Sequence, residues 1–314
     1  MNNLFSKCYE LMLNKDFLPK LSHSNIYHYT SESGFNSILF NSNDSENITL
    51  WASRYDCLND KSEGVIILEI YKETCKELLS DGKIDKTFYD IIVDLKPSDE
   101  VLFSFKPQQA KKSAMKKCER YIISFSMEED SLPMWNYYSK GNYYEGFNIG
   151  FYSNEIIDML QDVFADKFVN VWLGPVVYDK GKQKKVISDI ILNLYNSDYA
   201  NNEKFLIGFI SQRLFDLNLV FKNEKYKHEN EVRIVIDVAE NENDINVKYR
   251  TYKGYTIPYI EIKISKEKVI SVTLGPLPLR NTEIKKQKQI VKERLKRNGY
   301  NNALVNSSEI PVRF

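Results

Sequence analysis

Apolar and polar residues alternate over several short stretches of the chain, and this period of two predicts β-strands. The clearest stretches lie in the last third, at residues 230–239, 245–253, 256–265 and 269–277. Shorter stretches of the same kind occur earlier, at residues 25–30, 47–53, 120–127, 145–152 and 168–178. The pattern therefore predicts a sheet whose strands come from both ends of the chain.

Between the predicted strands, apolar residues recur at the three- and four-residue spacing of amphipathic helices. We expect helices within residues 2–14, 31–40, 61–118, 130–139, 153–161, 180–218 and 282–298. Strands at both ends with helices between them favour an α+β fold with a mixed or antiparallel sheet. No linker or repeat divides the chain. We expect one domain over residues 1–314, a helical insertion at about 61–118, and an edge strand near the C-terminus.

The composition predicts a folded chain and excludes some classes of function. Hydrophobic residues make up 43% of the 314 residues and aromatic residues 13%, which is enough for a large core. Lys and Arg balance Asp and Glu at 43 each. This zero net charge argues against a general nucleic-acid or membrane coat, but it leaves a local basic groove open.

The cysteines and the N-terminus bear on the compartment. Cys8, Cys57, Cys75 and Cys118 form no Cys-x-x-Cys pair, so neither a zinc site nor a disulfide framework is expected. The N-terminus lacks a signal-peptide core, and no apolar run reaches the roughly 18 residues of a membrane span. Free thiols fit a reducing compartment, so we expect a cytoplasmic protein without a membrane segment.

The first candidate for chemistry is Tyr27-His28-Tyr29-Thr30, in the strand that opens the predicted sheet. Neighbouring residues of a strand point to opposite faces, so His28 lies on one face while Tyr27 and Tyr29 lie on the other. The simplest interpretation is a buried histidine that bonds to the backbone. A histidine that binds a ligand is the alternative.

Two further candidates lie in the middle of the chain. Asn59 and Asp60, with Glu63, follow a predicted strand and are typical of an Asx turn and a helix cap. Their functional interpretation is the polar rim of a ligand cleft. Trp135 and Tyr138 are three residues apart and share a predicted helix face. Core packing is expected for Trp135, and a stacking role for one of the rings is the alternative.

The fourth candidate is the charged segment 227–233, which enters a predicted strand. Glu229, Glu231 and Arg233 alternate and are expected on one strand face, where three charges usually mark a solvated edge. When two carboxylates such as Glu229 and Glu231 lie this close, repulsion raises the pKa of one of them while the other stays ionised. An arginine such as Arg233 can hold the ionised carboxylate in place. A basic stretch at 106–120 is expected to be a solvated helix face, with an RNA groove as the alternative.

These motifs, in this order, resemble a bacterial family known as a domain of unknown function, numbered 2971. Its pattern combines an opening YHYTS, an Asn-Asp-Pro loop followed by Glu, an MW-x-x-Y segment with G-x-x-I-x-F, then E-x-E-x-R and a closing S-x-I-P-x-R. Where the family has Pro after Asn-Asp, this chain has Lys61. The other motifs stand at Tyr27–Ser31, Asn59–Glu63, Met134–Tyr138, Gly146–Phe151, Glu229–Arg233 and Ser308–Arg313.

The opening strand and the helix after it also resemble ADP-ribosyltransferase-like proteins. In that group the first strand carries a His or Arg that grips NAD, a second strand carries Ser-x-Ser or Tyr, and a late strand carries the catalytic Glu. The resemblance implies that His28 binds the NAD ribose and that Ser53 takes the second-strand position, where only one of the two hydroxyls is present. It implies Glu231 as the catalytic carboxylate and Glu229 as the residue that faces the acceptor.

The function implied is an NAD-consuming ADP-ribosyltransferase or NAD glycohydrolase, with NAD as substrate and no metal. Cleavage of the nicotinamide–ribose bond passes through an oxocarbenium-like state, which a carboxylate stabilises. We further expect a bacterial toxin or anti-phage defence effector, with a partner protein in such a system and an unknown acceptor. The expected nucleotide contacts are His28, Tyr29, Thr30, Ser53, Tyr55 and Tyr138.

Two other functions fit the same residues. Asp60, Glu63, Glu229 and Glu231 could serve a Mg²⁺-dependent nuclease, because acidic clusters bind Mg²⁺ with few protein ligands. A non-catalytic module that senses a nucleotide or binds a partner protein is the second. A requirement for Mg²⁺, or tight binding without turnover, distinguishes each from the NAD-consuming enzyme.

Overall fold

The computed structural model describes residues 24–40, 44–57, 66–105, 112–139, 146–277 and 280–311. The helix expected at 2–14 and the loop residues Asn59, Asp60 and Glu63 lie outside the described residues. Arg313 of the closing motif lies outside them as well.

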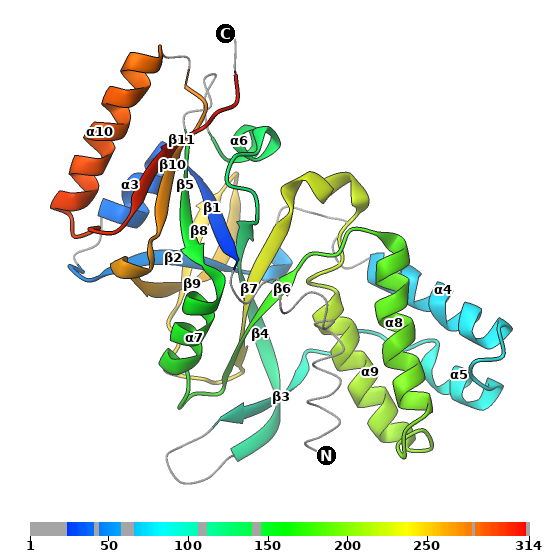
Figure 1. Ribbon diagram of the computed structural model, residues 1–314. Helices are drawn as coiled ribbons and strands as arrows, with labels where there is room; N and C mark the ends of the chain where they lie inside the picture. Colours follow the sequence, from blue (N-terminus) through cyan, green and yellow to red (C-terminus); the bar gives the residue numbers. More distant parts are fainter. Residues whose placement is uncertain are drawn as a thin grey trace.

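The described strands form one large sheet, mostly antiparallel (Figure 1). Along it the order is β11-β10-β5-β1-β4-β2-β9-β8; β7 also pairs with β4, β6 pairs with β7, and β3 pairs with β4. Only the β10–β11 pair is parallel among the described pairs. The strands are β1 (Asn25–Ser31), β2 (Asn47–Arg54), β3 (Glu100–Phe105), β4 (Lys112–Ser126), β5 (Gly146–Tyr152), β6 (Val169–Pro175), β7 (Glu231–Ala239), β8 (Val247–Tyr252), β9 (Tyr255–Ser265), β10 (Ser271–Leu274) and β11 (Leu304–Ser307). Each strand predicted from alternation is present, with bounds shifted by a few residues.

Strand β4 organises the sheet, because it pairs with β7 along one edge and with both β1 and β2 along the other. Paired residues point to the same face. Tyr27 pairs with Ser126, which pairs with Glu231, so these three define what we call face B. The residues that alternate with these along each strand, such as His28 and Phe125, point to the opposite face, which we call face A.

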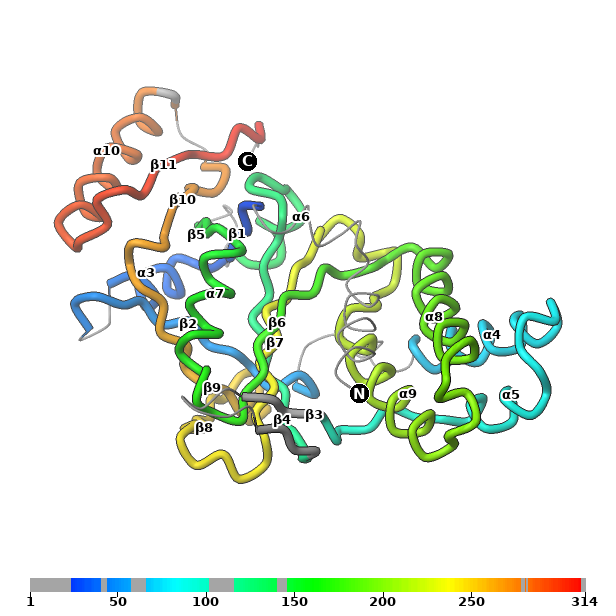
Figure 2. Tube along the Cα trace, turned by 60° about the horizontal axis from the view of Figure 1, so that its bottom comes forward, coloured from blue at the N-terminus to red at the C-terminus, as the bar shows by residue number. Residues whose placement is uncertain are grey.

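Helices cover both faces. On face A, the helices α3 (Glu32–Phe40), α7 (Ser153–Val163) and α10 (Asn281–Arg297) contribute to one apolar core. On face B, the helices α4 (Ile66–Ser80), α5 (Lys86–Ile92), α8 (Lys180–Tyr195) and α9 (Glu203–Leu217) build a second core over β4, β6 and β7. Figure 2 shows these four helices grouped together at one side of the molecule. The short helix α6 (Leu132–Tyr138) packs against Tyr27 and Tyr29, also on face B. Three 3-10 helices complete the described elements: η1 (Tyr55–Cys57), η2 (Glu224–Glu229) and η3 (Lys266–Lys268).

The helical insertion expected at 61–118 is only partly correct. Helices α4 and α5 confirm its first part, but residues 100–105 and 112–126 pair as the antiparallel strands β3 and β4. The basic stretch at 106–120 is therefore not a solvated helix face over its described part. Arg120 is fully buried on face B, where it forms ion pairs with Asp216 and Asp237. Strand pairing and these buried partners outweigh the local charge spacing that suggested a helix.

No helix among the described residues is long and apolar enough to cross a membrane. The three cysteines in the described part of the chain, Cys57, Cys75 and Cys118, are free thiols.

Candidate functional site

Asn230 joins η2 to β7 through a left-handed backbone turn with a φ of 41°. Asn adopts this conformation more readily than most residues. Its side chain donates a hydrogen bond to Glu128 Oε1 at 2.8 Å, and its carbonyl accepts one from the backbone of Met127 at 2.9 Å. The prediction that Glu229 alternates with Glu231 along one strand is therefore wrong, because Glu229 belongs to η2. The turn still brings both carboxylates to one lysine.

Glu231 opens β7 and is buried on face B, with 7% of its surface exposed. Arg233 donates to both carboxylate oxygens, at 2.8 Å and 3.0 Å, and Lys222 Nζ donates to Oε2 at 3.1 Å. The backbone N–H of Glu231 donates to the hydroxyl of Tyr178 at 3.0 Å. Burial alone would raise the pKa of Glu231, but Arg233 and Lys222 outweigh it and hold the pKa at about 2. Glu231 is ionised at neutral pH.

The expectation of a solvated charged edge is wrong for this segment. Strand β7 lies between β4 and β6, so its charges are internal to the sheet. Arg233 is 3% exposed, and its Nη1 donates to the backbone carbonyl of Leu219 at 2.7 Å. The pair of Glu231 and Arg233 is a fixed, bidentate ion pair, which adds geometric specificity as well as attraction.

Glu229 shares Lys222 with Glu231 but differs in its surroundings. Lys222 Nζ lies 2.6 Å from Glu229 Oε2, and the Glu229 side chain is 15% exposed. Burial raises the pKa of Glu229, the Lys222 ammonium offsets part of that rise, and the negative Glu231 adds to it. The two pKa values thus move in opposite directions, as the spacing predicted, although burial and not mutual repulsion is the main cause for Glu229.

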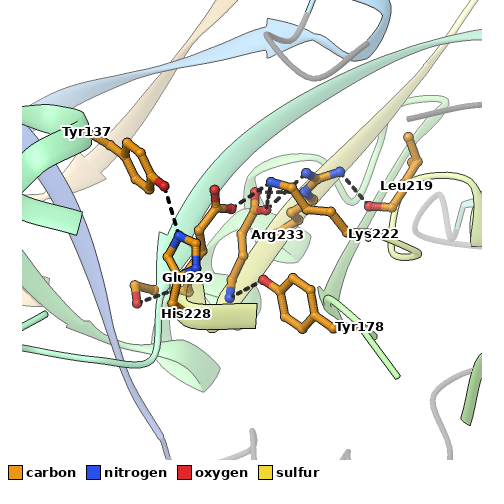
Figure 3. A network of polar contacts seen from close by, with 9 residues as sticks. Tyr137, Tyr178, Leu219, Lys222, His228, Glu229 and Arg233 are labelled. Carbon is orange, nitrogen blue, oxygen red and sulfur yellow. Dashed lines mark hydrogen bonds and ion pairs between the residues drawn. The ribbon is translucent and has the colours of Figure 1, made fainter. Parts of the chain in front are cut away.

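Two exposed tyrosines of α6, Tyr137 and Tyr138, lie near this site, and Figure 3 shows Tyr137 pointing toward His228. The Tyr137 hydroxyl lies 3.0 Å from Nε2 of His228, the residue before Glu229. Tyr138 is 43% exposed; burial of its hydroxyl end raises the pKa of Tyr138 to about 12, and the negative charges of Glu231 and Glu229 add to that rise. The phenol of Tyr138 therefore lies within electrostatic range of both carboxylates. We call Glu229, Glu231, Lys222, Tyr138 and His228 the carboxylate site.

The loop between β4 and α6 holds the carboxylate site against other motifs. Asp130 accepts hydrogen bonds from Trp135 Nε1 at 2.8 Å and from Ser308 Oγ at 2.7 Å. The neighbouring Glu128 accepts from Asn230, and its carbonyl accepts from the Tyr29 hydroxyl at 2.8 Å. Segments that are far apart in the sequence, including the opening strand and the closing Ser-x-Ile-Pro motif, thus meet at this loop.

His28 does not join the carboxylate site, which corrects the expectation that it faces Glu231 in one cleft. Its ring packs edge-on against Phe125 of the face A core, with centroids 5.7 Å apart, and its Nδ1 lies 3.1 Å from the backbone carbonyl of Ser124. Burial lowers the pKa of His28, so the imidazole is neutral at pH 7. The simpler interpretation, a buried histidine bonded to the backbone, is the one the structure bears out.

The other expected nucleotide contacts are also dispersed, except Tyr138. Tyr29 is buried against Trp135, with ring centroids 4.6 Å apart. Thr30 lies beside Gly34 at the start of α3, and Ser53 accepts a hydrogen bond from Arg250 at 2.9 Å. Tyr55 packs edge-on against Phe215 of α9. Because these side chains belong to β1, β2 and η1 and bond elsewhere, they do not form one ligand cleft with Glu231 among the described residues.

Two residues that form hydrogen bonds with Glu231 were not found from the sequence, namely Lys222 and Tyr178. Lys222 is 7% exposed and lies in a segment with several other lysines, so no pattern distinguishes it. Its pKa is raised because Glu231 and Glu229 outweigh the effect of burial. A signal did exist for such a partner, since two buried carboxylates need a compensating cation. Tyr178 follows β6 and carries no signal of its own.

Among the described residues, no group of three or more His, Cys, Asp or Glu side chains is arranged to hold a metal ion. The space between the two carboxylates is taken by the ammonium of Lys222.

Comparison with known proteins finds one family model that is similar to the segment around the site. No curated protein and no solved structure matches the chain. A family model does match, over a segment that runs from Met134 on α6 to Ile234 on β7 and contains the whole carboxylate site. This model, "Protein of unknown function (DUF2971)", matches residues 134–234 and confirms over this segment the resemblance that the motifs indicated.

Proposed function

We propose that the carboxylate site cleaves a glycosidic bond of a nucleotide, with NAD as the substrate, as an NAD glycohydrolase or ADP-ribosyltransferase. The observation that carries the proposal is the pair of Glu229 and Glu231, which share Lys222 but have pKa values displaced in opposite directions. Neighbouring carboxylates with divergent pKa values are the arrangement that divides acid–base and electrostatic roles in glycoside cleavage.

The geometry favours Glu229, and not Glu231, as the residue that touches the reacting atoms. Both oxygens of Glu231 already accept hydrogen bonds from Arg233, and one also accepts from Lys222. Glu229 is the more exposed of the two. Glu231 then acts through Lys222, whose position it fixes, and its negative charge stabilises a positively charged sugar ring at the site.

The reaction follows from these roles. The bond between the ribose C1′ and the nicotinamide nitrogen breaks, and its electron pair leaves with neutral nicotinamide. The oxocarbenium-like ribose that remains is attacked at C1′ by water or by an acceptor. Glu229 accepts the proton of that nucleophile, and a carboxylate with a raised pKa is a better base for this step than an ordinary one. The Tyr138 ring offers a surface on which an aromatic base can stack.

Release of nicotinamide from NAD tests the proposal directly. Wild-type protein should release nicotinamide; Glu229→Gln should lower the rate by about 10²–10⁴-fold, as loss of a general base does. Glu224→Gln is the matched control, because Glu224 lies on the same η2 turn with an exposed side chain that contacts only Lys227 among the described ion pairs. A wild type that leaves NAD intact with every acceptor tested, and in bacterial cells that express it, contradicts the proposal.

A toxin or defence effector of this kind lowers the NAD content of cells. Expression of the wild type in a bacterial host should therefore deplete NAD and slow growth, while Glu229→Gln should do neither. This comparison also tests for a partner, because co-expression of an inhibitory protein should restore both NAD and growth.

One observation favours binding without turnover as a second candidate. Arg233 and Lys222 saturate the Glu231 carboxylate, as in a structural ion network. A nucleotide-sensing module would show a raised melting temperature with NAD and no nicotinamide release. For a Mg²⁺-dependent nuclease, the two carboxylates would have to exchange Lys222 for the metal, and loss of nucleic-acid cleavage in chelator would identify it.

A further inference from the structure

The β8–β9 hairpin and its neighbour β2 present a continuous sheet surface on face B, away from the carboxylate site. Ser53 of β2 pairs with Ile122 of β4 and with Tyr259 of β9, and Tyr259 pairs with Lys248 of β8. The same register sets the rest of this surface, which we call the hairpin face. Its side chains are Thr49, Trp51, Ser53, Lys248, Arg250, Tyr252, Tyr255, Ile257, Tyr259, Glu261 and Lys263.

The hairpin face is open where its aromatic rings lie. Trp51 is 46% exposed and Tyr255 is 73% exposed. The face B helices α4, α5, α8 and α9 build their core over β4, β6 and β7, and Figures 1 and 2 both show these helices to one side of the hairpin. Large exposed aromatic side chains on an open sheet are surfaces for stacking.

The aromatic surface is held in place by its neighbours. The Trp51 ring lies on Tyr259, with centroids 4.5 Å apart, and the Arg250 guanidinium lies 5.7 Å from the Trp51 centroid. Arg250 is fixed in turn by its 2.9 Å hydrogen bond to Ser53. A ring that is already oriented loses little conformational freedom when a base stacks on it, which favours binding.

The hairpin face is basic although the chain as a whole is neutral. It carries Lys248, Arg250 and Lys263, with Lys253 at the hairpin turn 5.2 Å from the Tyr252 ring. Glu261 is the one acidic residue among the side chains named above, and it pairs with Lys248 at 2.8 Å. Asp44, which precedes β2, lies 3.9 Å from Lys263, so Arg250 and Lys253 carry most of the uncompensated positive charge. Positive charge interleaved with exposed rings is the pattern that tracks a phosphate backbone while bases stack.

We propose that the hairpin face binds single-stranded nucleic acid. Bases stack on Trp51, Tyr252 and Tyr255, and Arg250 and the lysines contact phosphates. The position opposite Trp51 is Glu261, six positions along β9 from Tyr255, and this span of about 20 Å accommodates several nucleotides. Lysines are depleted in protein–protein interfaces, so their number here favours a polyanion over a protein partner. This inference does not depend on the proposed function.

Fluorescence anisotropy with labelled single strands of about 15 nucleotides, a length matched to known sheet platforms, tests the inference. Oligo-U and oligo-dT should both bind, and the affinity should fall as salt rises from about 50 mM to 200 mM. Tyr255→Ala should weaken binding about tenfold, as loss of one stacked base does. Lys263→Gln should lower the slope of log affinity against log salt by about 0.7.

Tyr249→Ala is the matched control, because Tyr249 lies on β8 of the same hairpin and is exposed but belongs to the opposite face. It should bind like the wild type. Trp51→Phe keeps an aromatic ring packed on Tyr259, so the fold should be retained while the surface on which a base stacks becomes smaller. Weaker binding by this variant would therefore reflect weaker stacking and not a loss of fold. The inference is overturned if no single strand binds at low salt, or if Tyr255→Ala and Trp51→Phe bind unchanged. A dimeric wild type that binds no oligonucleotide and that Tyr255→Ala converts to a monomer would also overturn the inference. The hairpin face would then be the contact surface between two copies of the chain.

Discussion

The imidazole of His28 and the carboxylate of Glu231 point to opposite faces of the same sheet. Ser124 of β4 contacts both: its backbone carbonyl bonds to His28 Nδ1, and its hydroxyl helps to lower the pKa of Glu231. The position on β4 at which β1 pairs lies two residues from Ser124. His28 therefore forms a hydrogen bond with the backbone carbonyl of Ser124, close to the position at which β1 pairs with β4. This role is structural, because it pairs a buried backbone group.

His28→Gln separates this structural role from ligand binding. Gln can still donate to the Ser124 carbonyl, so NAD turnover should keep its KM, whereas a histidine that grips the ribose would raise KM strongly. His28→Ala should lower the melting temperature and leave KM unchanged in the fraction that is folded. A raised KM in His28→Gln at unchanged stability would contradict the structural assignment.

The same residue makes stability depend on pH. Burial lowers the pKa of His28 below 6.5, so the unfolded chain binds a proton more readily than the folded one. The free energy of unfolding should therefore fall as pH drops below about 6.5. Urea denaturation at several pH values should show a smaller fall in His28→Gln than in the wild type.

Lys222→Met should destabilise the fold strongly, because it leaves two carboxylates with one fewer cation in a buried site. Removal of one partner from a buried ion pair costs about 3–5 kcal/mol in the free energy of unfolding. Lys227→Met, on η2 with a 69% exposed side chain, should cost less than about 1 kcal/mol. Adding Glu229→Gln to Lys222→Met should recover part of the lost stability, and the absence of any recovery would show that the two groups are not coupled.

The sequence predicted most of the described strands because apolar residues alternate where a strand buries one face, as in β2, and run together where it buries both, as in β7. Local spacing correctly placed Glu231 and Arg233 on one strand face, but Glu229 reaches the same lysine through the turn at Asn230, which the spacing did not predict. It could not predict Lys222 or the separation of His28 from Glu231. The separation of His28 from Glu231 depends on which strands pair with β4 and in what register, and register is a tertiary property. The position of Lys222 depends on how the segment between α9 and η2 packs beside Val177, which is a tertiary property as well. The long strand β4 was missed in part because its burial of Arg120 relies on Asp216 of a distant helix.

Trp135→Ala should cost about 3–5 kcal/mol of unfolding free energy, as other large core truncations do. The ring is 1% exposed, packs on Tyr29, and donates from Nε1 to Asp130. Tyr137→Ala on the same short helix is the control, since Tyr137 is 57% exposed and should change stability little. Equal melting temperatures for Trp135→Ala and wild type would mean that the helix does not fasten the loop at Asp130.

The low pKa of Glu231 predicts loss of stability in acid. Its pKa is about 2 in the folded protein against an ordinary value of 4.5, so the folded state binds this proton less readily than the unfolded chain. The stabilisation is fully present above pH 4.5 and is lost as pH falls toward 2; a displacement of this size corresponds to about 3 kcal/mol. Glu231→Gln should therefore be less stable than wild type at pH 7, and the difference should shrink as pH falls below 4.5. Urea denaturation across this range measures it, with Glu224→Gln as the control on exposed η2. If Glu231→Gln and wild type lose stability in parallel below pH 4.5, Arg233 and Lys222 do not hold Glu231 in its ionised form.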